Sequence, residues 1–335
     1  MKKILIAIFL LFPITLFYTF FRVPVEGPVQ FPVKRGEDFR TTMRRLKREH
    51  IIRDTFRFLV LARIFHLDKK SKFGFYTFKR DLPEINVLLR LTVKGAPLKE
   101  FSIRIPEGST LKNIAPLFSK IGIEPDSFLR YTEDTVFIKK VKKCCNLMDT
   151  PSTLEGYLYP DTYIFAYGES VYDVVCKMLR RTCSVFDSTL IKRMHDMDFS
   201  MHEVLTLASL IEKEAMVDSE RYIISGVFHN RLRRGIPLAS NPTLNYILDK
   251  NYGWLPRWAI RTKNPYNTYI HPGLPPGPIC APSKKSIIAA LWPKKVNYLY
   301  FVARGDGTHL FARTYREHKK NIQYVKRLMF SDKSH

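Results

Sequence analysis

Residues 200–215 read SMHEVLTLASLIEKEA, and this stretch decides how the C-terminal half of the chain folds. Its apolar residues recur every three to four positions, which predicts an amphipathic helix. Ser200 and Glu203 have the S-x-x-E spacing of a capping box, so we expect the helix to begin there. We expect it to pack against a core through one apolar stripe, made of Val204, Leu207, Ala208, Ile211 and Ala215.

The end of this helix carries two acids, Glu212 and Glu214, whose surroundings differ. At about 100° per residue, Glu214 falls about 60° from the middle of the apolar stripe, and Glu212 about 100° from it on the other side. A carboxyl group beside apolar side chains loses hydration, which raises its pKa and lets it hold a proton near neutral pH. Glu214 is therefore the better candidate for a general acid, although a glutamate on a helix flank usually just pairs with Arg or Lys.

A proline-rich stretch downstream, residues 265–282, predicts a stiff loop. Six of the chain's 21 prolines fall there, and their fixed φ lowers the entropy cost of ordering the loop. The loop offers two aromatic rings and an amide, from Tyr266, Asn267 and Tyr269. These groups suit hydroxyl-rich sugar rings. A rigid connector that only packs on the helices is an alternative that the composition leaves open.

The N-terminus predicts a membrane anchor. Lys2 and Lys3 precede an apolar run over residues 4–21, and eighteen residues at 1.5 Å each give about 27 Å of helix, enough to cross a bilayer core. The run ends in YTFFR (18–22), which offers no small-residue cleavage site, so we expect a retained span rather than a removed signal peptide. The two lysines favour a cytoplasmic start. We therefore expect the rest of the chain to lie outside the cytoplasm.

Charge and composition narrow the function classes. The chain of 335 residues has 55 Lys and Arg against 31 Asp and Glu, a net charge of +24, which favours an anionic partner such as nucleic acid, a membrane surface or an acidic polymer. The expected location argues against nucleic acid. The sequence has no glycine-rich nucleotide loop and no metal-ligand spacing, so we expect no cofactor and no metal. The adjacent Cys144 and Cys145 are poorly placed to bond each other, so no disulfide framework can be read from the five cysteines, and the sequence does not settle their redox state.

Two segments of the N-terminal half look alike at an offset of 72 residues. Each reads as a short strand, a turn with glycine and an amphipathic helix, starting near Phe31 and near Ile103. Two short copies are too few for a solenoid. We expect a duplicated small α+β unit.

Longer motifs carry a resemblance. In chain order they are LEGYLYPDTY (154–163), LASLIEKEA (207–215), GVFHNRL (226–232), NPYNTY (264–269), GLPPGP (273–278), YLYFVA (298–303) and GTHLF (307–311). Together they resemble the motifs of the YceG-like endolytic murein transglycosylases, the MltG family. Their order and spacing match over roughly residues 150–320, and the region before them agrees in layout with the family's LysM-like subdomain.

The resemblance implies an α+β fold: a single transmembrane helix, small LysM-like α+β subdomains and a mixed α/β catalytic domain. In this chain the boundaries fall at 1–22 for the cytoplasmic start and anchor, 23–30 for a tether, 31–148 for the duplicated region and 149–330 for the catalytic domain. The implied protein is a single-pass lyase of the cell inner membrane with its catalytic domain in the periplasm. It would cut peptidoglycan glycan strands beside the cell-wall synthases and so end strand elongation.

The family's catalytic acid falls on Glu214, the acid that the helical wheel also prefers. In such an enzyme the glutamate protonates the glycosidic oxygen between N-acetylmuramic acid and N-acetylglucosamine. Its carboxylate then takes the proton of the muramic C6 hydroxyl, which attacks C1 and closes a 1,6-anhydro ring. The attacking oxygen belongs to the substrate, so one acid/base suffices, with no second carboxylate, metal or cofactor. We expect Asn230, Tyr266, Asn267 and Tyr269 to bind the substrate.

The chain departs from the family in one segment. Where the family commonly has L-Q-[ST]-D-P-T, residues 238–243 read LASNPT, with Ala239 and Asn241 in place of the amide and the carboxylate. One alternative is therefore a weak or inactive glycan-binding scaffold of the cell-wall machinery. Another is an ordinary glycoside hydrolase with a distant second carboxylate, such as Glu155, Asp161 or Asp218.

Overall fold

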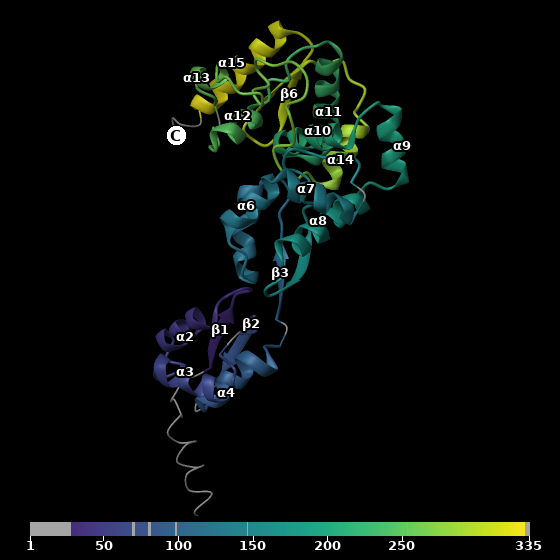
Figure 1. The fold of residues 1–335 in the computed structure, drawn as a ribbon. Coiled ribbons are helices and arrows are strands. Elements are labelled where there is room, and N and C mark those ends of the chain that lie inside the picture. The colour runs from purple at the N-terminus through teal and green to yellow at the C-terminus, as the bar shows by residue number, and fades with distance from the viewer. Residues whose placement is uncertain are drawn as a thin grey trace, which may run out of the picture. The chain divides into compact units, whose positions relative to one another are not determined.

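The computed structural model describes residues 28–331, apart from 69–70, 80–81, 98, 146 and 253. The expected membrane anchor, residues 4–21, lies outside the described residues. Within the described part, no helix combines the length and the apolar character needed to cross a membrane. The described chain has the expected α+β character, with helices and small two-stranded sheets (Figure 1).

The chain packs as two compact units. The first contains residues 28–102, 120–123 and 164–169, and the second contains 103–119, 124–163 and the chain from 170 onward. Most of the second copy of the repeat, residues 103–119 and 124–133, falls in the second unit. Its Gly108 amide donates to Ala281 at 2.8 Å, and the Ala281 amide donates to Ser109 at 2.8 Å.

The first unit is a β–α–α–β arrangement. Its elements are β1 (Val29–Val33), α2 (Phe39–Arg48), α3 (Thr55–Ile64) and β2 (Gly74–Phe78). The two strands pair antiparallel, with Phe31 opposite Tyr76. Asp38 and Asp54 begin the helices by accepting hydrogen bonds from amides of the first turn. Two short helical segments follow, α4 (Glu84–Leu89) and the π-helical η1 (Arg90–Lys94). Apolar faces of these elements close one core, made of Phe31, Val33, Leu46, Phe58, Leu61, Phe78, Leu88 and Leu91.

The second copy repeats the strand–helix–helix order. It consists of β3 (Glu100–Arg104), α5 (Leu111–Ile114), the 3-10 helix η2 (Ala115–Ile121) and α6 (Pro125–Glu133), and β3 pairs with β4 (Thr162–Ala166). A capping box of Thr110 and Asn113 begins α5. The local duplication therefore exists, but the two copies contribute to different cores.

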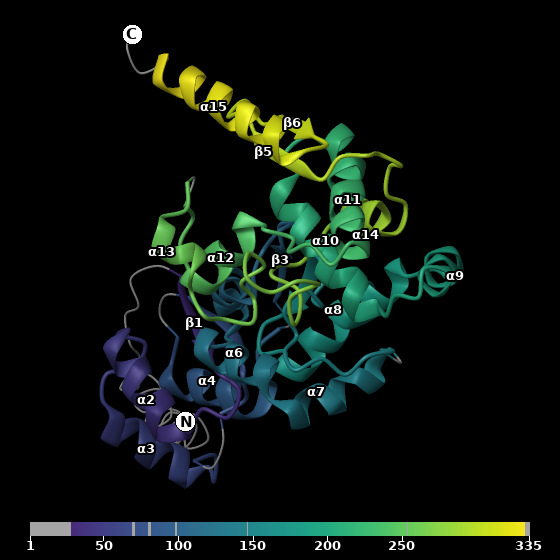
Figure 2. The same cartoon turned by 90° about the horizontal axis from the view of Figure 1, so that it is seen from above.

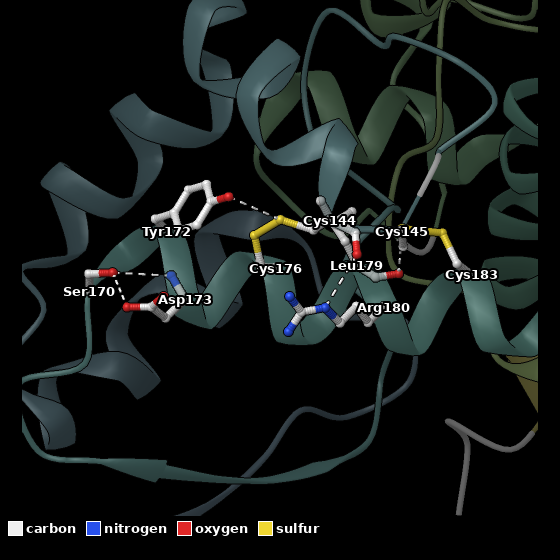
Figure 3. The surroundings of a disulfide bond; sticks show 9 residues. All are labelled: Cys144, Cys145, Ser170, Tyr172, Asp173, Cys176, Leu179, Arg180 and Cys183. Carbon is white, nitrogen blue, oxygen red and sulfur yellow. Dashed lines mark hydrogen bonds between the residues drawn. A yellow bond between two sulfur atoms is a disulfide. The ribbon is translucent and has the colours of Figure 1, made fainter.

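Two disulfide bonds settle the redox state of four cysteines, which the sequence left open. After α7 (Thr135–Val141), the short η3 (Lys142–Cys144) brings the adjacent cysteines to α8 (Val171–Val185), where Cys144 bonds Cys176 and Cys145 bonds Cys183 (Figure 3). The paired Cα atoms lie 5.5 and 6.3 Å apart. The sequence holds a signal for this: two cysteines seven residues apart share one face of a helix, so adjacent thiols can reach both.

The rest of the second unit surrounds one buried helix. In chain order it contains α9 (Ser188–Asp196), α10 (Met201–Glu214), α11 (Asp218–Arg233), α12 (Asn241–Leu248), α13 (Arg257–Ile260), α14 (Lys284–Leu291), the antiparallel strands β5 (Tyr300–Ala303) and β6 (His309–Ala312), and α15 (Tyr315–Ser331). α10 contacts α11, α12 and α14, and the three helices α10, α11 and α14 lie side by side in both views (Figures 1 and 2).

The predicted helix over residues 200–214 is confirmed, including its capping box of Ser200 and Glu203. Its buried surface is wider than the predicted stripe, because every residue from 204 to 211 is buried. The polar members of this run are satisfied locally: Ser209 donates to the Thr206 carbonyl at 2.7 Å and accepts from the Ile279 amide at 3.0 Å. Neighbouring elements therefore enclose α10 on more than one side.

We predict that the disulfides stabilise the second unit measurably. The two bonds close nearly the same loop, with sequence separations of 32 and 38 residues, so with one bond intact the other closes only about 8 further residues, which corresponds to about 2.5 kcal/mol. Cys176→Ser and Cys183→Ser should each lower the free energy of unfolding in urea, whereas the control Cys280→Ser removes only a free buried thiol. Denatured but unreduced protein should show a single reactive thiol. Five reactive thiols before reduction would contradict the pairing.

Candidate active site

Glu214 is the last residue of α10, and one contact holds its carboxylate in place. Oε1 accepts a 2.6 Å hydrogen bond from the hydroxyl of Ser240, a fully buried residue directly before α12. The helix ends at Ala215, whose amide still bonds to the Ile211 carbonyl. Glu214 itself keeps part of its surface exposed. The hydrogen bond from Ser240 thus fixes one oxygen of the Glu214 carboxyl group.

Ser240 is held both by Thr268 of the downstream loop and by the first turn of its own helix, α12. Its amide donates to Thr268 Oγ1 at 3.0 Å, and its carbonyl accepts from Thr243 Oγ1 at 2.8 Å. The preceding Ala239 has a positive φ of 48° and donates its amide to the Thr268 carbonyl at 2.8 Å. The predicted stiff loop therefore orients the hydroxyl that contacts Glu214.

Burial raises the pKa of Glu214 above the ordinary carboxyl value. The hydrogen bond from Ser240 and the fields of His309 and Arg231 oppose this effect without cancelling it. A carboxyl group in this state keeps its proton at a higher pH than an exposed glutamate does, as a general acid requires. The helical wheel placed Glu214 nearer to the apolar stripe than Glu212, and the burial of Glu214 is consistent with that placement.

Two basic side chains lie near Glu214 that the sequence analysis did not connect with it. Arg231 is buried and donates Nε to the Leu299 carbonyl and Nη1 to the Leu238 carbonyl, both at 2.6 Å. Its guanidinium stands over the Tyr300 ring, 5.1 Å from the centroid. The one sequence feature that pointed to Arg231 is its position in the GVFHNRL motif.

His309 is the second of these side chains. Its Nδ1 lies 2.8 Å from Glu220 Oε2, and its amide donates to Glu220 Oε1 at 3.1 Å. Both carboxylate oxygens of Glu220 are thus committed to one residue. Among the described residues no group of three His, Cys, Asp or Glu is placed to hold a metal ion.

Glu212 faces the opposite way and is a structural residue. Its Oε2 accepts hydrogen bonds from the Ser283 amide at 3.0 Å, from the Ser283 and Ser286 hydroxyls at 2.5 and 2.6 Å, and from Arg221 at 3.2 Å. Both members of the Glu212–Arg221 ion pair are buried. This carboxylate therefore joins the last turn of α10 to the start of α14 and to α11.

Of the four predicted substrate-binding residues, Tyr269 is the one that the structure brings to Glu214. Its hydroxyl donates to Asn241 Oδ1. Burial first, and the charge of Glu214 second, raise the pKa of Tyr269, so its proton is retained as a donor. Asn241 occupies the position of the family's aspartate and supplies an uncharged acceptor in its place.

Asn267 and Asn230 have their amides engaged by backbone. Asn267 is fully buried, and its Nδ2 donates to Ile260 at 2.9 Å and Thr262 at 2.8 Å. Asn230 Nδ2 donates to the carbonyls of Val296 at 2.8 Å and Tyr298 at 2.9 Å. These contacts favour a positioning role for both asparagines, and sugar binding by them remains a prediction.

Tyr266 lies nearer to Glu155 than to the end of α10. Its ring centroid is 5.4 Å from that of Tyr246, and burial with the nearby charge of Glu155 raises its pKa. Glu155 is buried, accepts the Leu111 amide at 3.1 and 3.2 Å, and has its pKa raised to about 7 by burial. It lines a separate cavity of about 590 Å³.

The other carboxylates considered as second catalytic groups are engaged in ion pairs. Asp161 accepts from Arg181 at 2.6 Å. Asp218 pairs with Arg221 at 3.2 Å and with Lys285. The site around Glu214 therefore has a carboxyl group with a raised pKa, supported by buried polar partners.

We predict stability effects of different size for the two glutamates of α10. Glu212→Ala leaves the buried Arg221 without its buried partner and should lower the free energy of unfolding by about 3 kcal/mol. Glu214→Ala removes a desolvated carboxyl group and should change it much less. Urea denaturation of both variants checks this, and equal destabilisation would contradict the assigned roles.

Comparisons with known proteins agree with the motifs. The profile of the YceG-like family matches residues 31–324. An endolytic murein transglycosylase of Bacillus subtilis (strain 168) is 34% identical over 259 residues, covering 74% of this chain and 71% of that protein. One from Streptococcus pneumoniae (strain ATCC BAA-255 / R6) is 30% identical over 279 residues, covering 75% of this chain and 50% of that protein.

A solved structure agrees as well. The crystal structure of a yceG-like protein from Listeria monocytogenes is similar with a TM-score of 0.61 and 28% identity, over 88% of this chain and 99% of that one. The matched region contains every residue described at the Glu214 site. The chain belongs to the YceG-like family.

Proposed function

We propose that this chain is an endolytic peptidoglycan lytic transglycosylase, a lyase, in which Glu214 is the only acid/base. The observation that carries the proposal is the state of Glu214, a carboxyl group with a raised pKa that buried Ser240 holds at 2.6 Å. The names of the curated relatives support the same reaction class.

The chemistry needs one group that first gives and then takes a proton. Protonated Glu214 donates to the glycosidic oxygen as the bond from C1 of the muramic residue breaks, and the leaving sugar takes that proton as a hydroxyl. The carboxylate then accepts the proton of the muramic C6 hydroxyl, while the C6 oxygen bonds to C1. The product is a 1,6-anhydro end, no water is consumed, and Glu214 finishes protonated as it began.

The surroundings of Glu214 suit these two steps. Burial favours the protonated form before cleavage, and Ser240, Arg231 and His309 stabilise the carboxylate that cleavage leaves. Of the three candidate second carboxylates, Asp161 and Asp218 are in ion pairs and Glu155 lines a separate cavity, so none of the three serves the Glu214 site as the water-activating base that a hydrolase requires.

We also propose that the enzyme works outside the cytoplasm, held by the apolar segment 4–21 in the inner membrane. The disulfides support this placement, because such bonds persist in oxidising compartments. The β–α–α–β arrangement of residues 29–78 supports the expected LysM-like, glycan-binding subdomain. In this setting the substrate is the nascent glycan strand, the neighbours are the cell-wall synthases, and each cut ends elongation of a strand.

We predict that Glu214→Gln abolishes cleavage. Loss of a general acid lowers kcat by at least about 10²-fold. The full chain in detergent and its variant are incubated with uncrosslinked glycan strands, and mass spectrometry reads the products. Wild type should give ends lighter by one water than hydrolytic ends. Glu155→Gln, the matched control at a buried carboxyl group outside the site, should keep cleaving.

Two results would overturn the assignment. Hydrolytic ends from the wild type, lost in Glu155→Gln, would identify a hydrolase with a second carboxylate. Binding of strands with no cleavage by the wild type would favour the glycan-binding scaffold.

We predict that Ser240→Ala moves the alkaline limb of the kcat profile to higher pH. The active form is protonated, so activity falls as pH rises through the pKa of Glu214. The Ser240 hydroxyl stabilises the charged form and lowers that pKa, so removing it raises the pKa further. Thr243→Val, which loses the bond to the Ser240 carbonyl instead, is the control. An alkaline limb that stays in place, or moves to lower pH, would contradict the role of Ser240.

A further inference from the structure

A basic cavity of about 750 Å³ lies in the second unit, apart from the residues that contact Glu214. It is formed by α9, the end of α11 and the segment 293–297. The cations that line it are Arg193, Arg233, Arg234, Lys294 and Lys295. Its lining, within the described part of the chain, includes no Asp or Glu.

The wall that carries the two lysines is held tightly against α11. The Lys294 amide donates to the Tyr222 carbonyl at 2.9 Å, and Asn230 clamps the carbonyl of Val296. Gly226 allows this approach, because a Cβ there would collide with the Lys294 carbonyl oxygen. The GVFHNRL motif therefore builds this cavity as well as supplying Arg231 to the Glu214 site.

The arginine side chains have spare donors toward the cavity. Arg193 uses Nε on the Leu291 carbonyl at 2.9 Å. Arg233 uses Nε weakly on the His229 carbonyl at 3.4 Å and Nη2 on Asn230 at 2.5 Å. Each guanidinium has five N–H donors, so both retain several for a ligand. The contacts shown for the five cations in the described structure include no carboxylate.

The buried ring of His229 lies within the electrostatic influence of two of these arginines. Its Nε2 bonds to the Ala290 carbonyl at 2.8 Å. Burial lowers the pKa of His229, and the charges of Arg233 and Arg193 lower it further. Like charges held this close repel one another, which disfavours the folded chain unless an anion neutralises them.

We propose that this cavity binds a phosphoryl group, carried by a small phosphate ion or by a phosphorylated headgroup. Several positive charges match a multiply charged anion better than a single carboxylate. Guanidinium forks match phosphate oxygens in pairs, and the lysines add point charges. The volume leaves room for the group to which the phosphate is attached. This binding site goes beyond the proposed cleavage of glycan strands.

Calorimetry on the full chain in detergent, at physiological salt to suppress weak surface binding, tests the proposal. The probes are inorganic pyrophosphate and a soluble short-chain phosphatidylglycerol. The test variant combines Arg234→Gln with Lys295→Gln, two exposed side chains on the cavity wall. The control combines Arg130→Gln with Lys139→Gln, which removes the same charge from exposed positions on α6 and α7.

We expect wild type to bind at least one probe, the test variant to bind it at least about tenfold more weakly, and the control to bind it as wild type does. Binding of pyrophosphate alone identifies a free ion as the source, and binding of the lipid identifies a headgroup. Absence of binding to both probes would overturn the proposal. Equal weakening in the control would also overturn it, because net charge alone would then explain the binding.

Discussion

The rest of the site depends on the buried anchor of Glu212. Its carboxylate receives four hydrogen bonds from α11 and the start of α14, and these fix the rotation of the last turn of α10. Glu214 follows two residues later, about 200° around the helix. Its side chain therefore points to the opposite side of α10, where it contacts Ser240. Glu212 thus stabilises the end of α10, and this positions Glu214 for its proposed role as the acid/base.

The opposite wall of the site is made mainly of backbone and small polar groups. The backbone amides of Ala239 and Ser240 both donate hydrogen bonds to Thr268. This uncharged network orients the Ser240 hydroxyl toward Glu214. This explains how the chain can depart from the family at two positions. Ala239 takes part through its amide, and Asn241 keeps an oxygen for the Tyr269 hydroxyl. An uncharged residue at 241 also spares Glu214 the repulsion of a neighbouring carboxylate, which would raise its pKa further.

Local patterns predicted the local features well. The period of the apolar residues predicted α10, and the S-x-x-E spacing predicted its capping box, because helix geometry relates neighbours in sequence to neighbours in space. Contacts between distant residues were harder. The His309–Glu220 pair and the Arg231 bonds join residues 89 and 68 positions apart, and no local period reports them. The disulfides were missed for a related reason: the adjacent cysteines were compared with each other and not with the face of α8. Asn230 and Asn267 have residue types suited to sugars, yet their amides are engaged by carbonyls.

The central claim is that the oxygen which attacks C1 comes from the substrate and that Glu214 moves the proton. Cleavage of glycan strands in water labelled with heavy oxygen tests this most directly, with the products read by mass spectrometry. The account predicts that no label enters the new muramic ends, whatever the extent of cleavage. One labelled oxygen at each new end would contradict it, because water would then be the nucleophile and a second catalytic group would be required.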